Sequence, residues 1–439
     1  MTADSPDAAG PQQLLKSINR MALVRHLFAN PGLSRADLAA AVQLTKSTVS
    51  LLVRELVSEG WLVERDVVPT GDLGRRPTPL FTDPTRLQLL GAEVGIEAVR
   101  AVATSLTGDI VAKAVVNHGA DRSAKACIAS LATVFLKLRK QLDADRHQII
   151  GIGVGLPGGV DEASGFLHFA PNLGWRDVPF GSLLGAKMAG STLAGVPLFL
   201  QNEADVAALG EMEFNPAQGS DPLLYVSVNQ GVGAGVIVGD RLLTGSRGFA
   251  GEVGHTILQR NGPLCSCGRR GCAEALIGFR AMQPADAPPS LGTPLLEIAR
   301  RLAERDKATL AAVGQAGAHL GVLLQNLTAA YDPACIVLGG SAVELGDTFV
   351  HPALSTLNDY AAAANLSPPL LRVSRFGADA VAVGSAALAR YRLTRPLIAP
   401  SPSQAATSSR LARKLPAKTP HPGAALVLAP RRRVMQETD

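Results

Sequence analysis

Apolar residues near the N-terminus recur at helical spacing. Leu23, Leu27 and Phe28 fall on one face of a helix, and the Pro-Gly pair that follows them ends it. Ser34 then stands where a side-chain oxygen can cap the next helix, which is predicted over residues 35–41. The chain is therefore expected to begin with two short helices joined by a tight turn.

A third helix is predicted to begin near Thr45. Its inward face consists of apolar residues at helical spacing, namely Val49, Leu52, Val53 and Leu56. The opposite face is polar, and its candidate DNA contacts are Lys46, Ser47, Thr48, Ser50 and Arg54. Short polar side chains near the start of such a helix fit base edges in a major groove, while Lys and Arg neutralise phosphates.

A small hairpin follows the third helix. Residues 60–64 predict a strand, residues 70–77 a glycine-rich tip, and a return strand runs to Phe81. This succession is typical of a winged helix-turn-helix over residues 12–82, whose wing would offer Arg75 and Arg76 to the minor groove or the DNA backbone.

Beyond residue 89 the pattern changes to strands that alternate with helices. Strands are predicted over residues 89–94, 99–104, 110–116, 149–154, 198–200, 223–228 and 336–338, and helices over residues 203–212 and 308–331. Such alternation implies an α/β domain with mixed sheets.

Composition limits the class of protein. The chain has 439 residues, of which 47% are hydrophobic, but no apolar run reaches the ~18 residues that a membrane span needs. The first ten residues lack the apolar stretch of a secretory signal, so we expect a cytoplasmic protein with no membrane partner.

Charge is distributed unevenly along the chain. Residues 1–82, 83–391 and 392–439 carry net charges of +1, −3 and +7. The basic, Pro- and Ala-rich tail over residues 392–439 is expected to be disordered, and either contacts nucleic acid nonspecifically or has no function. The low charge of the first segment leaves open a helical protein-interaction domain instead of a DNA-binding one.

A histidine and a cluster of cysteines predict a metal site. Cys265, Cys267 and Cys272 follow His255 closely, whereas Cys127 and Cys335 sit alone in apolar segments. An N/S₃ donor set with no spare position suits a closed, structural zinc site. A redox pair or plain core cysteines are the alternatives.

Several separated motifs resemble the ROK family (repressor, open reading frame, kinase) of bacterial sugar kinases and sugar-responsive regulators. These are residues 170–173 (Ala-Pro-Asn-Leu), the glycine-rich residues 229–235, and residues 251–255 together with the cysteine cluster and Glu274. The resemblance implies a two-lobed actin-like ATPase (ribonuclease H-like) sugar-binding domain over residues 83–391, with a zinc knuckle.

A sugar presents a ring of hydroxyl groups, so its site needs carboxylates and amides that each make two hydrogen bonds. The candidate sugar-binding residues are Asn172, Asn202, Glu203, Glu252, His255 and Glu274. Their place within the family's motifs supports this set, because an isolated Asn or Glu in a loop is usually solvated.

The chain departs from the kinase pattern of the family at several positions. After the first strand, Glu93 and Glu97 stand where kinases have Asp and a phosphate-binding Thr, and Gln230 replaces a Thr of the second phosphate loop. Glu203 takes the place of the catalytic Asp, and its extra methylene misplaces a base by about an ångström, which costs on the order of 10²-fold in rate. We therefore assign no catalytic residues.

The chain is interpreted as a regulator, similar to the xylose-repressor branch of the family. A monosaccharide would release it from a double-stranded DNA operator, which a homodimer or homotetramer would read by symmetry. Two alternatives are an ATP-dependent sugar kinase with an accessory DNA-binding domain and a nucleic-acid-binding protein that senses no sugar.

Overall fold

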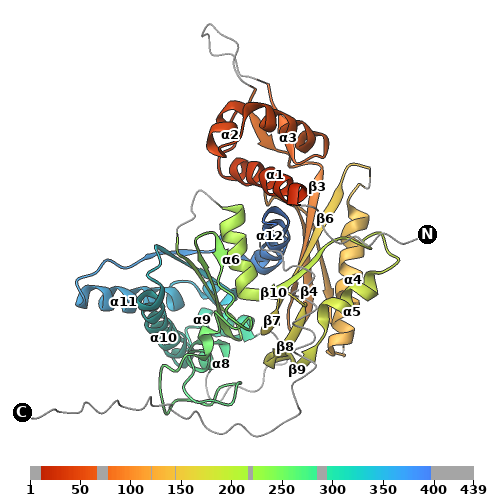
Figure 1. Cartoon of the computed structure of the whole chain (residues 1–439). Coiled ribbons are helices and arrows are strands. Elements are labelled where there is room, and N and C mark those ends of the chain that lie inside the picture. Colours follow the sequence, from red (N-terminus) through yellow and green to blue (C-terminus); the bar gives the residue numbers. More distant parts are fainter. Residues whose placement is uncertain are drawn as a thin grey trace, which may run out of the picture. The chain divides into compact units, whose positions relative to one another are not determined.

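The computed structural model describes residues 11–66, 78–119, 121–143, 145–215, 221–283 and 294–396 (Figure 1). Within these residues the chain forms a helical N-terminal domain and a larger α/β domain with two five-stranded sheets. The α/β alternation predicted from the sequence is confirmed.

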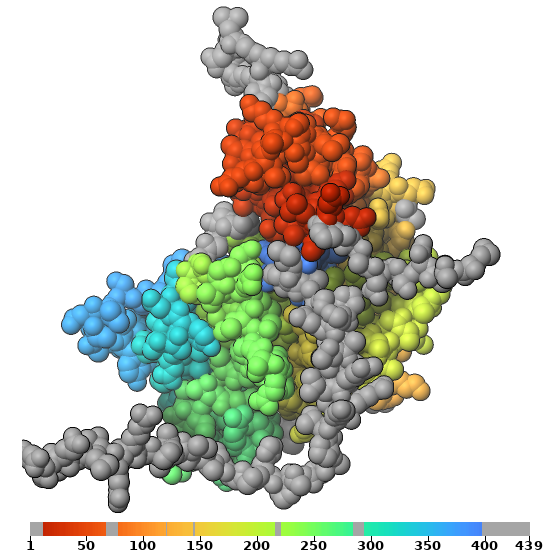
Figure 2. Space-filling model, in the orientation of Figure 1, coloured from red at the N-terminus to blue at the C-terminus, as the bar shows by residue number. Residues whose placement is uncertain are grey.

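The N-terminal domain contains helices followed by a short antiparallel hairpin. Their bounds are α1 Pro11–Ala29, α2 Arg35–Ala41, α3 Lys46–Ser58, β1 Leu62–Glu64 and β2 Leu80–Thr82. The side chains of Ser34 and Thr45 cap α2 and α3, which confirms both predicted helix starts. Leu23, Leu38 and Leu56 are fully buried in the shared core, and the domain forms one rounded body in Figure 2 (red).

The base of the predicted wing is present, with Val63 of β1 opposite Phe81 of β2. The wing tip, including Arg75 and Arg76, falls in residues 67–77 and lies outside the described residues. The predicted tail also lies outside them from residue 397 onward.

The first lobe of the large domain is built on a mixed sheet with the strand order β10-β6-β3-β4-β5. The strands are β3 Leu87–Val94, β4 Ala98–Ser105, β5 Ile110–Asn117, β6 Gln148–Leu156 and β10 Leu198–Asn202. Because β3 and β10 both run parallel to β6, Glu93 and Asn202 lie together at the carboxyl ends of these strands. Helices α4 (Ala124–Gln141) and α5 (Phe180–Met188) cover one face (Figure 1).

A small antiparallel sheet extends this lobe. It consists of β7 Gly159–Asp161, β8 Phe166–Ala170 and β9 Trp175–Val178. The 3₁₀ turn η1, Pro171–Leu173, connects β8 to β9 and carries Asn172.

The second lobe has the strand order β13-β12-β11-β14-β15. Its strands are β11 Leu223–Val228, β12 Val232–Val238, β13 Arg241–Leu242, β14 Cys335–Gly339 and β15 Leu370–Val373. Its helices are α7 Ala273–Ile277, α8 Phe279–Met282, α9 Pro294–Ala303, α10 Lys307–Tyr331 and α11 Asp347–Ala363, with 3₁₀ turns η3 Val253–His255, η4 Ser341–Leu345 and η5 Gly377–Asp379. The long helices α10 and α11 pack against each other and bury Leu320 and Phe349 with the sheet (Figure 1).

Two helices cross between the sheets, α6 (Glu203–Phe214) and α12 (Ala380–Thr394) (Figure 1). They approach so closely that a Cβ at Gly384 would lie 2.1 Å from the carbonyl oxygen of Val206, and one at Gly210 would lie 3.1 Å from the Cα of Gly384. Glycine at these positions therefore fixes the distance between the helices, and with it the place of the first residues of α6.

The predicted elements agree with the structure to within a few residues at their ends, and Cys127 and Cys335 are buried as expected. None of the described helices is both long and apolar enough to cross a membrane.

Candidate functional site

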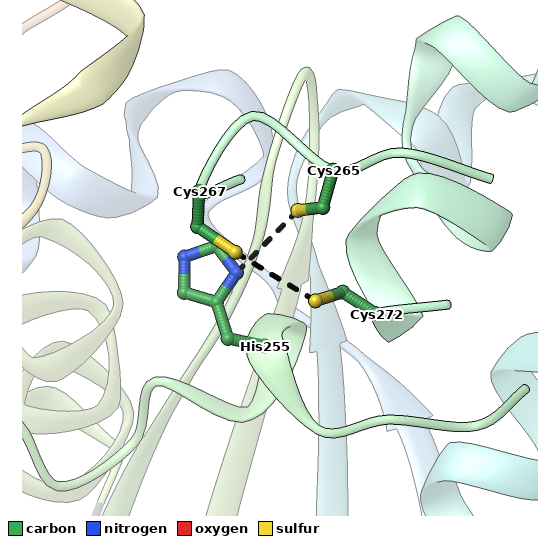
Figure 3. A group of neighbouring side chains, drawn as sticks. All are labelled: His255, Cys265, Cys267 and Cys272. Carbon is green, nitrogen blue, oxygen red and sulfur yellow. Dashed lines mark hydrogen bonds between the residues drawn. The ribbon is translucent and has the colours of Figure 1, made fainter. Parts of the chain in front are cut away.

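The predicted metal-binding residues come together in the second lobe. The ligand atoms of His255, Cys265, Cys267 and Cys272 all lie within 4.8 Å of one another (Figure 3). His255 ends η3, the first two cysteines lie on the following loop, and Cys272 directly precedes α7. Residues that are up to 17 positions apart thus face one point.

Tight turns hold the loop in this form. Gly271 has φ +72°, and a Cβ there would lie 1.5 Å from the carbonyl oxygen of Gln259, so only glycine fits. The backbone N–H of Cys265 donates to the carbonyl of Arg269 at 2.8 Å. The side chain of Arg269 donates to the sulfur of Cys267 at 3.3 Å. Burial opposes ionisation of Cys267, but the hydrogen bonds from Arg269 outweigh it and lower the pKa of this thiol.

The geometry fits a tetrahedral metal. With zinc–ligand distances of about 2.0–2.3 Å, neighbouring donor atoms of a tetrahedron should lie roughly 3.5–3.8 Å apart. The sulfurs of Cys267 and Cys272 lie 3.7 Å apart, as do the sulfur of Cys265 and Nδ1 of His255 (Figure 3). The four side chains could therefore hold one zinc ion through Nδ1 and three sulfurs.

The metal-binding group adjoins two predicted sugar-binding carboxylates. Ser266 donates a hydrogen bond of 2.6 Å to Oε1 of Glu274. Nε2 of His255, which is not needed for the metal, lies 3.8 Å from Oε2 of Glu252. The loop that carries the cysteines thus also orients Glu252 and Glu274.

Residues of both lobes meet over Gly231. A Cβ at this glycine would lie 2.9 Å from Oε2 of Glu274 and 3.6 Å from Nδ2 of Asn172. Asn172 belongs to the first lobe and Glu274 to the second, so these two predicted sugar contacts lie close together between the lobes.

Asn202 and Glu203 stand at the start of α6. The amide of Asn202 donates to the carbonyl of Gly158 at 2.9 Å, and its Oδ1 accepts the N–H of Ala204 at 2.8 Å as a helix cap. An amide has two N–H groups and two acceptor lone pairs, so one of each remains for a ligand. The side chain of Asn202 is thus already held in place by two hydrogen bonds.

Several carboxylates lie close together around the start of α6. Burial, with repulsion from Glu93, Glu252 and Glu274, raises the pKa of Glu203 to about 7. Burial likewise raises the pKa of Glu93 to about 7 and the pKa of Glu252 above its ordinary value. Hydroxyl donors from a ligand would stabilise these acids in their ionised form.

Asp205 is a further acid that sequence reasoning missed. Burial raises its pKa well above the ordinary range, and its Oδ1 has no hydrogen-bond partner among the described residues. The same holds for Oε2 of Glu93. The signal for Asp205 was its place two residues after Glu203, in the otherwise apolar first half of the helix.

Two of the four positions predicted to depart from the kinase pattern, Glu97 and Gln230, lie at turns. Glu97 is exposed in the turn between β3 and β4, and Gln230 lies half-buried in the turn between β11 and β12. In that second turn, Oδ1 of Asn229 accepts bonds from both the N–H and the hydroxyl of Ser341, at 2.7 and 2.8 Å.

The polar face of α3 is open to solvent. Lys46, Ser47 and Arg54 are exposed, while Thr48 and Ser50 are half-buried. Lys46 and Arg54 form no ion pair within the described part of the chain, so both charges are available to phosphates. Leu51 is 51% exposed on the same helix and was missed, although an apolar side chain there suits contact with a thymine methyl.

Comparison with known protein families identifies the class of protein to which this chain belongs. The model of the ROK family matches residues 89–392, and a winged helix-turn-helix DNA-binding model matches residues 16–63. The chain belongs to the ROK family.

Its relatives include both regulators and kinases. It is 32% identical over 333 residues to a xylose repressor of Bacillus subtilis, covering 76% of this chain and 84% of the relative. It is 27% identical over 319 residues to a glucokinase of Halalkalibacterium halodurans, covering 69% of this chain and 95% of the relative. The crystal structure of a ROK family transcriptional regulator, a homologue of the E. coli MLC protein, has the same fold, with a TM-score of 0.71, 22% identity and coverage of 88% of this chain and 98% of that one.

Proposed function

We propose that this chain is a sugar-responsive transcriptional regulator that binds a DNA operator, represses transcription and is released by a monosaccharide. The observation that carries the proposal is the combination of a winged helix-turn-helix with a ROK domain in which Glu97 and Gln230 stand in place of phosphate-binding hydroxyls. The similarity to the xylose repressor of Bacillus subtilis supports it and makes D-xylose the first sugar to test.

The proposed division of labour follows the domains. Residues 12–82 read DNA, residues 83–391 bind the sugar, and residues 392–439 are a basic tail. On the DNA side the contacts are Lys46, Ser47, Thr48, Ser50 and Arg54 of α3, with Arg75 and Arg76 of the wing. A homodimer or homotetramer would present two such helices to the half-sites of an operator.

The sugar is proposed to bind between the lobes. Its hydroxyls would donate to Glu203, Glu252 and Glu274, and would bond to the remaining positions of the Asn172 and Asn202 amides. Support comes from the proximity of Asn172 and Glu274 over Gly231 and from the partly buried acids around Glu203. His255 would contribute through Nε2, since its other ring nitrogen faces the cysteines.

Zinc is proposed as a structural ion held by His255, Cys265, Cys267 and Cys272. A closed N/S₃ site supplies folding stability and leaves no coordination position for catalysis. The residues around it then hold Glu252 and Glu274 toward the sugar.

The chain is proposed to have no kinase activity. Phosphoryl transfer needs an undisturbed phosphate site and a placed base. Glu97 and Gln230 replace phosphate-binding hydroxyls, and Glu203, with a raised pKa and a longer side chain, replaces the base. The kinase alternative rests on the glucokinase relatives and predicts turnover.

The proposal is tested with purified full-length chain. Titration calorimetry against D-xylose, D-glucose and N-acetylglucosamine identifies the sugar, and selection from a randomised duplex pool identifies the operator. Addition of the bound sugar should weaken operator binding about 5- to 150-fold. Operator affinity that no sugar of the panel changes would overturn the proposal, and ATP consumption at about 1–100 per second with any of these sugars would favour the kinase.

A further inference from the structure

Arg390 of α12 lies buried between two aromatic rings from different domains. Its guanidinium carbon is 4.0 Å from the ring centroid of Phe28 in α1 and 4.5 Å from that of Phe214 in α6. All three of its nitrogens donate hydrogen bonds, Nε to the carboxylate of Glu213 at 2.8 Å, and the others to the carbonyls of Leu106 and Glu213. Arg390 is thus held tightly on the side of the large domain.

Two of the residues that hold Arg390, Glu213 and Phe214, belong to the helix that starts in the proposed sugar site. Glu213 and Phe214 are the last residues of α6, and Glu203 is the first. A helix of this length spans about 18 Å and moves as one body. Any displacement of Asn202 and Glu203 by a ligand therefore reaches the ring of Phe214 and the carboxylate that orients Arg390.

Around Arg390, the area of contact between the N-terminal domain and the large domain is small. The N-terminal and large domains belong to one compact unit. Phe28 packs against the cores of both, and Arg25, one turn earlier, donates to the carbonyl of Thr394 at the end of α12. Beside them a cavity of about 360 Å³, lined by residues that include Leu27, Phe81 and Thr107, separates the hairpin from the large domain. A few side chains, on α1 and at Trp61, therefore carry much of the contact.

We infer that Arg390 and Phe28 are the positioning residues through which the sugar site sets the orientation of the DNA-binding domain. The inference rests on the proposed function. When α6 shifts, Phe214 and Glu213 rotate the guanidinium of Arg390. The cation–π contact between Arg390 and the ring of Phe28 is then broken or formed. Phe28 belongs to the same domain as the recognition helix α3. That domain is therefore fixed against the large domain when the contact is made and released from it when the contact is broken.

The contact between Arg390 and Phe28 is strong enough to contribute to the coupling between sugar binding and operator binding. A cation–π pair is worth a factor of about 2 to 30 in an equilibrium constant, depending on its burial. Coupling between two ligands in regulators usually amounts to a factor of about 5 to 150. Loss of one well-buried pair could thus remove a large share of the coupling.

The test uses Phe28→Leu in the full-length chain, because Phe28 is half-buried and lies outside the hydrogen-bond network of Arg390. The dissociation constant of the operator duplex recovered by selection is measured by fluorescence anisotropy with and without D-xylose. We expect the ratio of the two constants to fall at least threefold relative to wild type, while the affinity of the DNA-free protein for D-xylose is unchanged. Phe28→Trp, which keeps an aromatic face, should retain the wild-type ratio.

Phe81→Leu is the matched control, because Phe81 stacks with Arg65 of its own domain at 4.4 Å. It can change operator affinity, but by the same factor with and without D-xylose. A merely structural role of Phe28 predicts the same behaviour, so an unchanged ratio in Phe28→Leu overturns the inference. If wild type shows no response to D-xylose or the other sugars, the proposed function fails first and the coupling with it.

Discussion

Replacing Gly384 by alanine should destabilise the large domain and weaken sugar binding. The new Cβ would lie 2.1 Å from the carbonyl oxygen and 2.4 Å from the carbonyl carbon of Val206 in α6. Ordinary carbon contacts need about 3.5 Å, so α6 and α12 must separate by more than about 1 Å.

The magnitude follows from two opposed effects. Alanine is favoured over glycine in a helix by about 1 kcal/mol. Overpacking in a well-packed interior costs about 1–3 kcal/mol, and here the obstacle is backbone that cannot rotate away. Because backbone must move, we take the upper part of that range, about 2–3 kcal/mol, and expect a net loss of about 1–2 kcal/mol in the free energy of unfolding. Because α6 carries Asn202 and Glu203, its displacement should also weaken D-xylose binding at least tenfold, which corresponds to about 1.4 kcal/mol.

Gly314→Ala provides the matched control. Gly314 lies inside α10, and a Cβ there would meet no atom within 4 Å. The same substitution should raise stability by about 0.5–1 kcal/mol and leave sugar binding unchanged. Thermal unfolding and titration calorimetry of the variants decide the matter, and a Gly384→Ala variant as stable as wild type would refute the argument from helix contact.

Three further outcomes are expected. Metal analysis should find one zinc per chain in wild type and none in Cys267→Ala, and this variant should also unfold at a lower temperature. A Cys267→Ala variant that keeps its zinc would contradict the ligand assignment. Glu203 has a pKa of about 7 in the folded chain and an ordinary value of 4.5, so the free energy of unfolding falls as pH rises between these values. Glu203→Gln should therefore be more stable than wild type at pH 8 but not at pH 4. An equal gain in stability at both pH values would exclude the ionisation of Glu203 as the cause. Lys46→Ala should weaken operator binding and reduce its salt dependence by about one counterion without changing sugar affinity, and an unchanged salt slope would show that Lys46 contacts no phosphate.

Much of the fold could be predicted because its signals are local. Helix α3 has an apolar stripe and a capping Thr45, and β11 is a short apolar run bounded by turn residues. The metal group was predictable because its cysteines are close in sequence and few chemistries use that spacing. The candidate sugar residues came from the family resemblance, since Asn172 and Glu274 are distant in sequence and meet only in the folded chain.

What could not be predicted depends on long-range packing. Helix α12 is buried on nearly every side, so its sequence has no polar stripe that would mark its orientation. Arg390 looks like a surface residue in the sequence, yet it is enclosed by Phe28 and Phe214, which are 362 and 176 residues away. Asp205 was hidden for the same reason, because only the assembled lobes bury it.

The capping role of Asn202 has an evolutionary consequence. Its side chain holds the start of α6 and a neighbouring loop together, so a substitution that alters sugar recognition there also frays the helix. Under the proposed function, mutations that adapt the protein to a new effector should therefore fall at Asn172, Glu252 and Glu274, whose backbones lie in turns or beside the metal-binding loop. A lineage could exchange its inducer by changing those positions while Asn202 stayed fixed by folding.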